Sequence, residues 1–557
     1  MSEPNAPGPR SPDSVDPDSG PPQPATPESS RSAESDEARS EARAASLTRR
    51  QLLTGAGAGA AAFFLDRSGL RAAVPTESIQ ARPGPGRPQQ AGAVVFTHTT
   101  VVDPDDVRDD VALAVSDGRI AAIGPTDDVL RRFPAAERYD GRGKALLPGL
   151  INCHAHMAAV IARGFNEDFG FPNTADLPVS PGSLLSPEEN VLMVQVAALE
   201  AIKTGTTTIV QNTGGIQAHA SALADSGLRC VFAESVRDTE NVPGPVTPHA
   251  LNRTEPIRFS PKLRQEGMQR IHDLFEAWHG KRNGRIQVFP AAALTETSSP
   301  ELLQAVRAFA EENDVGYTIH LNQSRAEFQF MQMYHGMRPT AYLDRHDFLG
   351  PRLFAAHARY VDDGEIHLLG RSRTIISHQA AMAGNRGVAP PIPALRAAGA
   401  RIALGTDNNT NDLFEVMRIA LIMERIRRNR DGDEIPGLQP QPEDMLADAV
   451  QGGAHAIHQE TELGALEEGK KADLLVVDTR RATLLPRGRF LSALVHCGHP
   501  DAIESNMVDG RFLMRDREVL SMDEEQILGD AERVGRRVWN RVLEEGTVKV
   551  PRLARPS

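Results

Sequence analysis

The alternation of apolar and helical segments after residue 145 constrains the fold more than any other feature of this sequence. Eight apolar segments have the length and the β-branched content of buried strands, and segments with helical periodicity separate them. Strands that alternate with helices form parallel sheets, and eight strands close a (β/α)8 TIM barrel. A doubly wound open sheet is the alternative that the pattern leaves open. The expected strands are 146–153, 206–211, 228–234, 286–292, 315–320, 352–357, 373–378 and 401–406, and the expected helices include 187–204, 262–279, 299–313, 362–370 and 392–399.

Short strand-like segments flank this region on both sides. They lie within 93–145 before it and within 464–520 after it, and Gly, Asp and Pro punctuate them. We expect them to pair into a discontinuous small β-sandwich domain built from both flanks of a barrel at 146–463. Residues 521–557 follow as a helical tail, which is amphipathic over its first part.

The N-terminus differs from the rest of the chain. Residues 1–46 are rich in Pro, Ser, Glu, Asp and Ala and carry almost no large apolar residues, which predicts disorder. Residues 47–75 resemble a twin-arginine export signal, because Arg49 and Arg50 precede a moderately apolar run that is too short to span a bilayer comfortably. This resemblance predicts contact with the twin-arginine export machinery and a periplasmic, extracellular or membrane-anchored location on the outer face.

The net charge argues against nucleic-acid binding, and the cysteine content argues against disulfide bonds and cysteine-ligated zinc. The formal net charge of −13 argues against a nucleic-acid partner, which needs a basic surface. The three cysteines lie far apart in the sequence, so neither a disulfide framework nor a cysteine-based zinc site is expected.

Two histidines end the first expected strand of the barrel, in the stretch ALLPGLINCHAH. His154 and His156 are two residues apart, so their side chains lie on one side of a strand and are able to hold one metal ion. With 17 histidines in the chain, such a pair arises easily by chance. Four further polar residues follow other expected strands, however, and the carboxyl ends of barrel strands share one face. The sequence therefore predicts a metal site from residues at five strand ends: His154, His156, His320, His357, His378 and Asp407.

Several of these motifs resemble the metal-dependent amidohydrolase superfamily. The similarity lies in LPGLINCHAH, in the strand ending at His320, in AAHARY around His357, and in LGTDNN around Asp407. GALEEGKKADLLVVD resembles the C-terminal sandwich strand of that superfamily, and residues 336–350 and 411–421 resemble the branch of S-adenosylhomocysteine/methylthioadenosine (adenosine-like) deaminases and s-triazine chlorohydrolases. The resemblance covers about residues 93–520. It implies a hydrolase that acts on carbon–nitrogen bonds other than peptide bonds.

Carried to this sequence, the resemblance implies that His154, His156, His320 and Asp407 ligate one divalent ion, with Zn²⁺ expected and Fe²⁺ as the alternative. His357 would hydrogen-bond the water that the metal activates. The chain has no lysine between Lys281 and Lys470, so the last five expected strands cannot supply the carboxylated lysine that bridges two metals in other members. We therefore expect a mononuclear centre.

One position departs from the branch pattern. Gln323 stands where the deaminases have a glutamate that carries protons, and an amide cannot do so. Either Glu327 takes over that role, or the leaving group needs little protonation, or the protein binds without efficient turnover. The other interpretation of Glu327 is a solvated carboxylate at a helix start.

The substrate is expected to be a small flat heterocycle. Long segments after the first and third strands, 157–186 and 236–261, would cover the barrel mouth. His378, Arg163 and His335 are candidate substrate contacts, and phenylalanines at 165, 169 and 171 suit an aromatic ring. The alternatives are a hydrolase that opens a cyclic amide of the imidazolone or lactam type and an exported metal-containing binding protein with degenerate catalysis. Relatives of the branch commonly form dimers, so a homodimer is a further expectation.

Overall fold

The computed structural model describes residues 92–169, 177–242, 244–408, 410–430, 432, 439–486 and 488–547. The predicted disordered region (1–46) and the signal-like segment (47–75) lie outside the described residues, as does Phe171, and they stay predictions. In the part of the chain that is described, no helix has the length and apolar character needed to cross a membrane.

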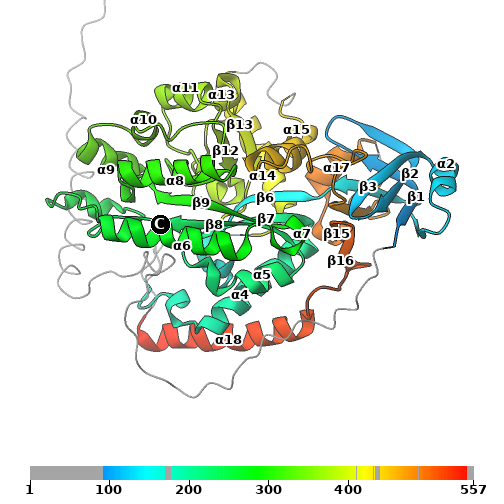
Figure 1. Cartoon of the computed structure of the whole chain (residues 1–557), viewed down its shortest axis with the longest axis horizontal. Coiled ribbons are helices and arrows are strands. Elements are labelled where there is room, and N and C mark those ends of the chain that lie inside the picture. The colour runs from blue at the N-terminus through cyan, green and yellow to red at the C-terminus, as the bar shows by residue number, and fades with distance from the viewer. Residues whose placement is uncertain are drawn as a thin grey trace, which may run out of the picture. The chain divides into compact units, whose positions relative to one another are not determined.

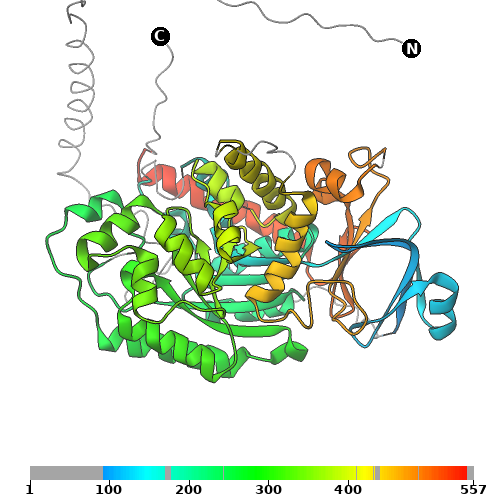
Figure 2. The same cartoon turned by 90° about the horizontal axis from the view of Figure 1, so that it is seen from above.

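The central element is a barrel of eight parallel strands, with helices packed around it (Figures 1 and 2). Neighbouring strands in the barrel are also consecutive in the chain, and a parallel bridge between Ala155 and Asp407 joins the last strand region to the first. A doubly wound sheet would reverse its strand order, so this alternative is excluded and the barrel is confirmed. The strands are β6 (Leu150–Ala155), β7 (Thr206–Thr213), β8 (Arg229–Val236), β9 (Ile286–Leu294), β10 (Tyr317–Leu321), β11 (Leu353–His357), β12 (Ile375–His378) and β13 (Arg401–Leu404).

The outer helices begin where the sequence places capping residues. Three of them start at Ser-Pro pairs, in which the serine hydroxyl accepts a backbone N–H of the first turn and proline takes a position that needs no donor. These three are α4 (Pro187–Lys203), α6 (Pro261–Trp278) and α8 (Pro300–Glu312). Asp362 caps α11 (Asp363–Arg371) in the same way. The remaining helices of the barrel region are α5 (Ala220–Asp225), α7 (Lys281–Gly284), α9 (Arg325–His335), α10 (Pro339–Arg345), α12 (Ala380–Asn385), α13 (Ile392–Ala398), α14 (Leu413–Arg430), α15 (Pro442–Ala447) and α16 (Gly453–Ala456).

The expected first strand, 146–153, is divided between two sheets, and this corrects the prediction. Its first half belongs to β5 (Lys144–Pro148), which pairs with a flanking strand, and its second half begins β6 of the barrel. Gly149 lies between them, where the backbone passes so close to Thr207 that a Cβ atom would sit 2.2 Å from Oγ1. The Pro148–Gly149 pair marks this division in the sequence, but both halves are buried, so the apolar pattern alone does not show that they join different sheets.

We expect Gly149→Ala to destabilise the protein by about 3 kcal/mol, since the new methyl group has to displace Thr207 in a fully packed region. Thermal unfolding of the variant against the wild type measures the loss. Gly124→Ala is the matched control, because no atom lies within 4 Å of the Cβ that it adds. Equal losses in the two variants would contradict this account of Gly149.

The flanking segments pair from both sides of the barrel, as the sequence predicts (Figure 1). The prediction was a small sandwich, whereas the observed strands are hydrogen-bonded into one nine-stranded sheet. The aromatic rings of Phe96, Tyr139 and Phe512 meet inside it, 5.0 to 6.3 Å apart between centroids, although Phe96 and Phe512 come from distant strands. The strands are β1 (Val94–Val102), β2 (Val107–Ser116), β3 (Arg119–Pro125), β4 (Glu137–Asp140) and β5 before the barrel, and β14 (Leu474–Asp478), β15 (Ile503–Val508), β16 (Arg511–Arg515) and β17 (Glu518–Val519) after it; helix α2 (Thr126–Arg132) packs on β2 and β3.

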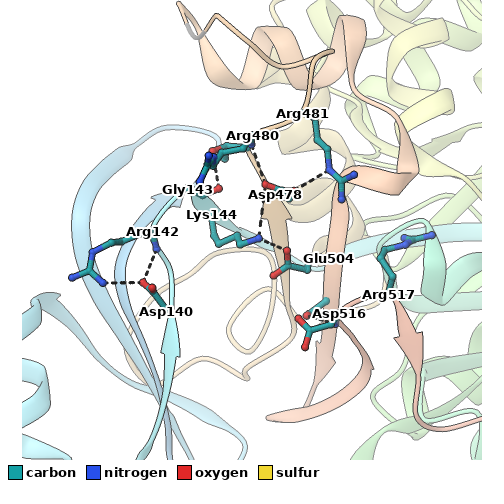
Figure 3. Close-up of polar contacts among 12 residues, drawn as sticks. Asp140, Arg142, Gly143, Lys144, Asp478, Arg480, Arg481, Glu504, Asp516 and Arg517 are labelled. Carbon is teal, nitrogen blue, oxygen red and sulfur yellow. Dashed lines mark hydrogen bonds and ion pairs between the residues drawn. The ribbon is translucent and has the colours of Figure 1, made fainter.

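A charged cluster joins the two flanks across this sheet (Figure 3). Lys144 of β5 forms ion pairs with Glu504 of β15 and with Asp478 of β14, the latter at 3.8 Å. Tyr139 donates its hydroxyl to the same Glu504 at 2.7 Å. Residues 360 positions apart are thereby held together at the point where the chain enters and leaves the barrel.

The last described helix, α18 (Glu524–Glu545), packs on α4 through Ile527, Val534, Val538 and Val542. Trp539 of this helix donates its indole N–H to the carbonyl of Ile161 at 3.0 Å, in the segment that follows β6. The C-terminal part of the chain therefore contacts a loop on the carboxyl face of the barrel. A further helix, α17 (Phe490–Cys497), lies between β14 and β15 in the chain and contacts α14 and α15.

Candidate metal centre

Four histidines and one aspartate converge at the carboxyl ends of β6, β10, β11 and β13. His154 lies within β6, His156 follows it, His320 is in β10, His357 ends β11, and Asp407 comes three residues after β13. Two sets of ligand atoms lie within 4.8 Å of one another: His154, His156 and His320, and His154, His357 and Asp407. The structure thus brings together the residues that the sequence places at separate strand ends.

His320 and His156 present the same ring nitrogen to each other. Their Nε2 atoms are 3.3 Å apart, and Nδ1 of His320 donates to the carbonyl of Ala293 at 2.8 Å. That bond fixes the proton on Nδ1 and leaves the Nε2 lone pair facing the cluster. Two nitrogen ligands of one tetrahedral ion, each about 2.05 Å from it, stand about 3.3 Å apart. The spacing therefore fits two ligands of a single metal.

His154 provides a second sign of a metal site. It is fully buried, and among the described residues neither of its ring nitrogens has a hydrogen-bond partner. A buried polar group without a partner costs about 1–3 kcal/mol, and native proteins avoid this unless another ligand satisfies it. A metal ion at the centre of the cluster would satisfy the ring nitrogen of His154 that faces it.

Asp407 lies between two of the imidazoles. Its Oδ1 is 3.6 Å from Nε2 of His156, and its Oδ2 is 3.8 Å from Nε2 of His357. Burial raises the pKa of the Asp407 carboxyl above its ordinary value, and the nearby His320 and Arg359 oppose that rise. One carboxylate oxygen can therefore ligate a metal while the other faces His357.

The imidazoles are held in the neutral form that binds metals. Burial lowers the pKa of His156 and of His320 to about 4, and it lowers the pKa of His154 and His357 well below the ordinary value of 6.5. Mutual repulsion adds to burial for His154, because three other histidines surround it. The four rings are accordingly uncharged at neutral pH, as metal ligation requires.

Two amide side chains place the ligand-bearing backbone. Asn152 accepts the N–H groups of His154 and Thr406, both at 3.2 Å, and so ties β6 to the segment that carries Asp407. Gln379 accepts the N–H of His357 at 2.9 Å. Both Asp407 and His357 adopt positive φ angles, 64° and 82°, which are costly for residues with a side chain. These hydrogen bonds stabilise the strained backbone on which the candidate ligands depend.

The structure contradicts one of the two sequence interpretations of Glu327, and its role as a proton carrier stays a prediction. It is fully buried, so the solvated helix-start carboxylate is wrong. Its oxygens accept the N–H groups of Asn322 at 2.9 Å and Gln323 at 2.7 Å, and the hydroxyl of Thr295 at 2.8 Å. These donors direct its carboxylate at the loop that follows His320, which makes Glu327 a positioning residue for that loop. The Gln323 side chain is buried in the same loop, and the backbone carbonyl of Gln323 accepts a hydrogen bond from Arg359.

The buried pair Glu327 and Glu296 predicts a pH-dependent stability. Burial, and then repulsion from Glu296, raises the pKa of Glu327 from 4.5 to about 8. The folded state thus holds a proton that the unfolded state releases near pH 4.5, so this stabilisation is present below pH 4.5 and is lost as the pH rises to about 8. We expect the unfolding free energy of the wild type relative to Glu327→Gln to fall by a few kcal/mol, roughly, between pH 5 and 8.

Denaturant unfolding of the wild type and Glu327→Gln across this pH range measures the difference, and it cancels the contribution of the histidines, which both proteins share. Glu276→Gln, at an exposed position of α6, is the matched control. A difference that does not change with pH would contradict a shared buried proton.

The three candidate substrate contacts, His378, His335 and Arg163, have different surroundings. His378 ends β12 and is buried, its Nδ1 has no partner among the described residues, and burial lowers its pKa to about 3. His335 packs against Tyr342 with the two rings tilted, 4.7 Å between centroids, at the junction of α9 and α10. Arg163 pairs with Glu200 of α4, and Phe165 packs against Trp539. The side chain of Phe169 lies outside the described residues. The contacts of Arg163 and Phe165 are thus with the helical layer.

Sequence reasoning missed two arginines near the cluster. Arg359 follows His357 by two residues and is buried, and Arg386 bridges the loop after β12 to the carbonyls of Asn166 and Glu167 after β6. The charges of both act on Asp407. The position of Arg359 just after a strand end was the available signal, because that is where barrel residues reach the mouth. Arg386 follows the short helix α12, so its position carried no such signal.

Comparisons with known proteins agree with this geometry. The model of the Amidohydrolase family matches residues 145–513, and an imidazolonepropionase-like composite domain of bacteria matches residues 112–136. A 5-methylthioadenosine/S-adenosylhomocysteine deaminase of Desulforudis audaxviator is 31% identical over 434 residues, which are 76% of this chain and 94% of the relative. A 5'-deoxyadenosine deaminase of Methanobrevibacter smithii is 28% identical over 446 residues, 78% of this chain and 95% of the relative.

Solved structures share the fold. An adenosine deaminase from Xanthomonas campestris with bound zinc superimposes with a TM-score of 0.68 at 23% identity, covering 80% of this chain and 98% of its own. An atrazine chlorohydrolase from Arthrobacter aurescens TC1, complexed with zinc, gives 0.67 at 20% identity, with 79% and 100% covered. At these identities the likeness shows the arrangement of barrel and sheet.

Proposed function

The chain belongs to the amidohydrolase family, and from that premise we propose that it hydrolyses the exocyclic C6–N bond of a 6-aminopurine nucleoside, so that the oxygen of water replaces the amino group and ammonia is released. The observation that carries the proposal is the convergence of three neutral imidazoles and Asp407 on one point, where His154 has no hydrogen-bond partner among the described residues. Relatives named as deaminases of methylthioadenosine, S-adenosylhomocysteine and 5'-deoxyadenosine, aligned over three quarters of this chain, support the substrate class.

His154, His156, His320 and Asp407 would hold one divalent metal, which supplies a water acidified to a pKa near 7. We propose zinc, because three imidazole nitrogens and one carboxylate oxygen form a common zinc donor set and two structural neighbours contain zinc. Asp407 accepts the proton of the attacking water on its free oxygen, and His357, 3.8 Å away, orients that water by a hydrogen bond.

Gln323 supports a second candidate reaction. In the loop after His320 it provides an amide, which orients a ring nitrogen by hydrogen bonding but transfers no proton to a leaving group. A leaving group that departs as a stable anion, such as a halide on a heteroaromatic carbon, needs no such proton. The same metal centre would then perform a hydrolytic displacement of the kind that the name of the atrazine chlorohydrolase describes.

A panel of metal-replete reactions separates these candidates. Ammonia release is measured on adenosine-type nucleosides, halide release on chlorinated triazines and purines, and ring-opening absorbance on cyclic amides. Ammonia release from the nucleosides is the expected result. If ring opening dominates, or if no compound reacts, the proposed deamination is overturned.

The variant Gln323→Glu tests how the leaving group is protonated. We expect ammonia release to become about tenfold faster, because a carboxyl adds general acid–base assistance, whereas halide release changes little. Steady-state kinetics on one amino and one chloro substrate with the same ring give the comparison. Gln323→Asn, which shortens the side chain without adding a titratable group, is the control. Equal acceleration of both substrates would show that the variant acts through binding and not through proton transfer.

A further inference from the structure

A cavity of about 720 Å³ lies at the junction of the sheet and the barrel, well away from the metal cluster. The turn between β2 and β3, the turn between β15 and β16, and the segments before β8 and β9 line it, and it is partly open to solvent. These barrel segments are at the amino ends of the strands, whereas the metal cluster is at the carboxyl ends. Since β8 has eight residues that rise about 3.3 Å each, the two sites are on the order of 20 Å apart.

The two turns that form one wall have the same sequence and conformation. Each reads Asp-Gly-Arg, at 117–119 and at 509–511, and in each the Asp and Gly have positive φ angles, as type I′ hairpin turns require. They pack so closely that a Cβ on Gly118 would lie 3.1 Å from the carbonyl oxygen of Asp509. This arrangement brings the arginine that follows each turn to the cavity.

The lining carries more positive than negative charge. Its cations outnumber its carboxylates by five to three, in a chain whose formal net charge is −13. The cations are Arg119, Arg282, Arg285, Lys471 and Arg511, and the carboxylates are those of Asp117, Asp225 and Asp509. A positive cavity in an acidic protein concentrates anions.

Two of these cations lack a carboxylate in contact. Arg511 forms no ion pair with any described residue, and Arg285 donates only to the backbone carbonyls of Leu228 and Ala224, at 2.7 and 3.4 Å. Arg119 and Arg282 are each paired, with Glu462 at 2.8 Å and with Asp225 at 2.5 Å. Burial lowers the pKa of the Arg285 guanidinium, because the charged form loses hydration in the folded protein.

Lys471 is the third cation with spare binding capacity. It reaches Asp509 only at 3.5 Å, and that carboxylate is already bound by the buried Arg229 at 2.5 Å. The ammonium group therefore keeps donors for a ligand. Together the three groups present guanidinium and ammonium donors to one partly open pocket, which is the combination that proteins use for phosphate.

We propose that this cavity binds the phosphate group of a small phosphorylated molecule, through Arg285, Lys471 and Arg511. Its volume is several times that of a phosphate ion and falls within the range of sites for small organic ligands, so the rest of the ligand also fits. The site is independent of the proposed catalytic reaction, because no residue of the metal cluster lines it.

Titration calorimetry on the metal-replete full chain tests the proposal, with inorganic phosphate, ribose 5-phosphate and ribose as probes. Ribose 5-phosphate is expected to bind more tightly than phosphate, ribose is not expected to bind, and added salt is expected to weaken binding. We expect Arg511→Gln and Lys471→Gln each to weaken binding about tenfold, since each removes a charge-assisted hydrogen bond. Arg541→Gln, at an exposed position of α18, is the matched control and should bind as the wild type does.

The wild type and all the variants have the same metal centre. A difference in affinity between them therefore reports binding in the cavity and not binding of phosphate to the metal. Arg511 is exposed at the end of a turn, so its variant is expected to fold. Unchanged affinity in Arg511→Gln, equal binding of ribose and ribose 5-phosphate, or no binding up to about 10 mM would each overturn the proposal.

Discussion

Asp407→Asn is expected to lower kcat/KM by a factor on the order of 10⁴ while the fold is retained. The amide keeps the shape of the side chain but cannot accept a proton, and it is a weaker metal ligand. Because Asp407 lies 3.6 Å from Nε2 of His156 and 3.8 Å from Nε2 of His357, the substitution affects ligation and proton transfer together.

The measurement combines steady-state kinetics, elemental analysis and thermal unfolding. Metal content separates the two effects: a variant that keeps its metal but not its activity has lost proton transfer. Asp501→Asn, at an exposed position, is the control for a general effect of removing a carboxylate. Wild-type activity in Asp407→Asn would refute the mechanism assigned to this residue.

His154→Leu is expected to abolish metal binding and activity, yet to leave the metal-free protein at least as stable as the metal-free wild type. The first effect follows from the loss of the most buried candidate ligand. The second follows because leucine has about the same size and removes two buried nitrogens that lack partners, each of which costs about 1–3 kcal/mol. Added zinc should raise the unfolding temperature of the wild type only.

His219→Leu is the matched control for this variant. His219 is also buried, but its Nε2 lies 3.2 Å from Nε2 of Gln211, so its loss leaves an amide unpaired and should reduce stability. Metal titration followed by thermal unfolding of all three proteins gives the comparison. If His154→Leu binds one equivalent of zinc as tightly as the wild type, the assignment of His154 as a ligand is wrong.

Most of the barrel was predictable from the alternation of strand and helix patterns, because each strand and the helix that follows it are neighbours in the sequence. Most of the expected strands differ from the observed ones by one or two residues at their ends. The first strand was predicted as one because the apolar residues on both sides of Pro148–Gly149 are buried. That pair is a turn signal at the point where the chain passes from one sheet to the other, but the burial pattern does not say which sheet each half joins.

The convergence at the barrel mouth was predictable in the same way, since strand ends in a barrel share one face. The hydrogen bonds that place the site were not predictable. Asn152 and Gln379 are ordinary amides in the sequence, and their roles depend on partners more than 20 positions away. Glu327 is a candidate proton carrier in the sequence because it lies four residues after Gln323, and that role stays a prediction. The backbone N–H groups that hold its carboxyl group are aligned only in the folded loop.

The contact between Trp539 and Ile161 links the order of synthesis to the onset of activity. These residues are 378 positions apart, and one belongs to the loop that directly follows His156. At 5–20 residues per second, a ribosome needs about 20–75 s to make the intervening chain. A nascent polypeptide therefore has its first two histidines long before the helix that braces them, and a message cut short near its 3′ end yields a chain whose catalytic face lacks this support.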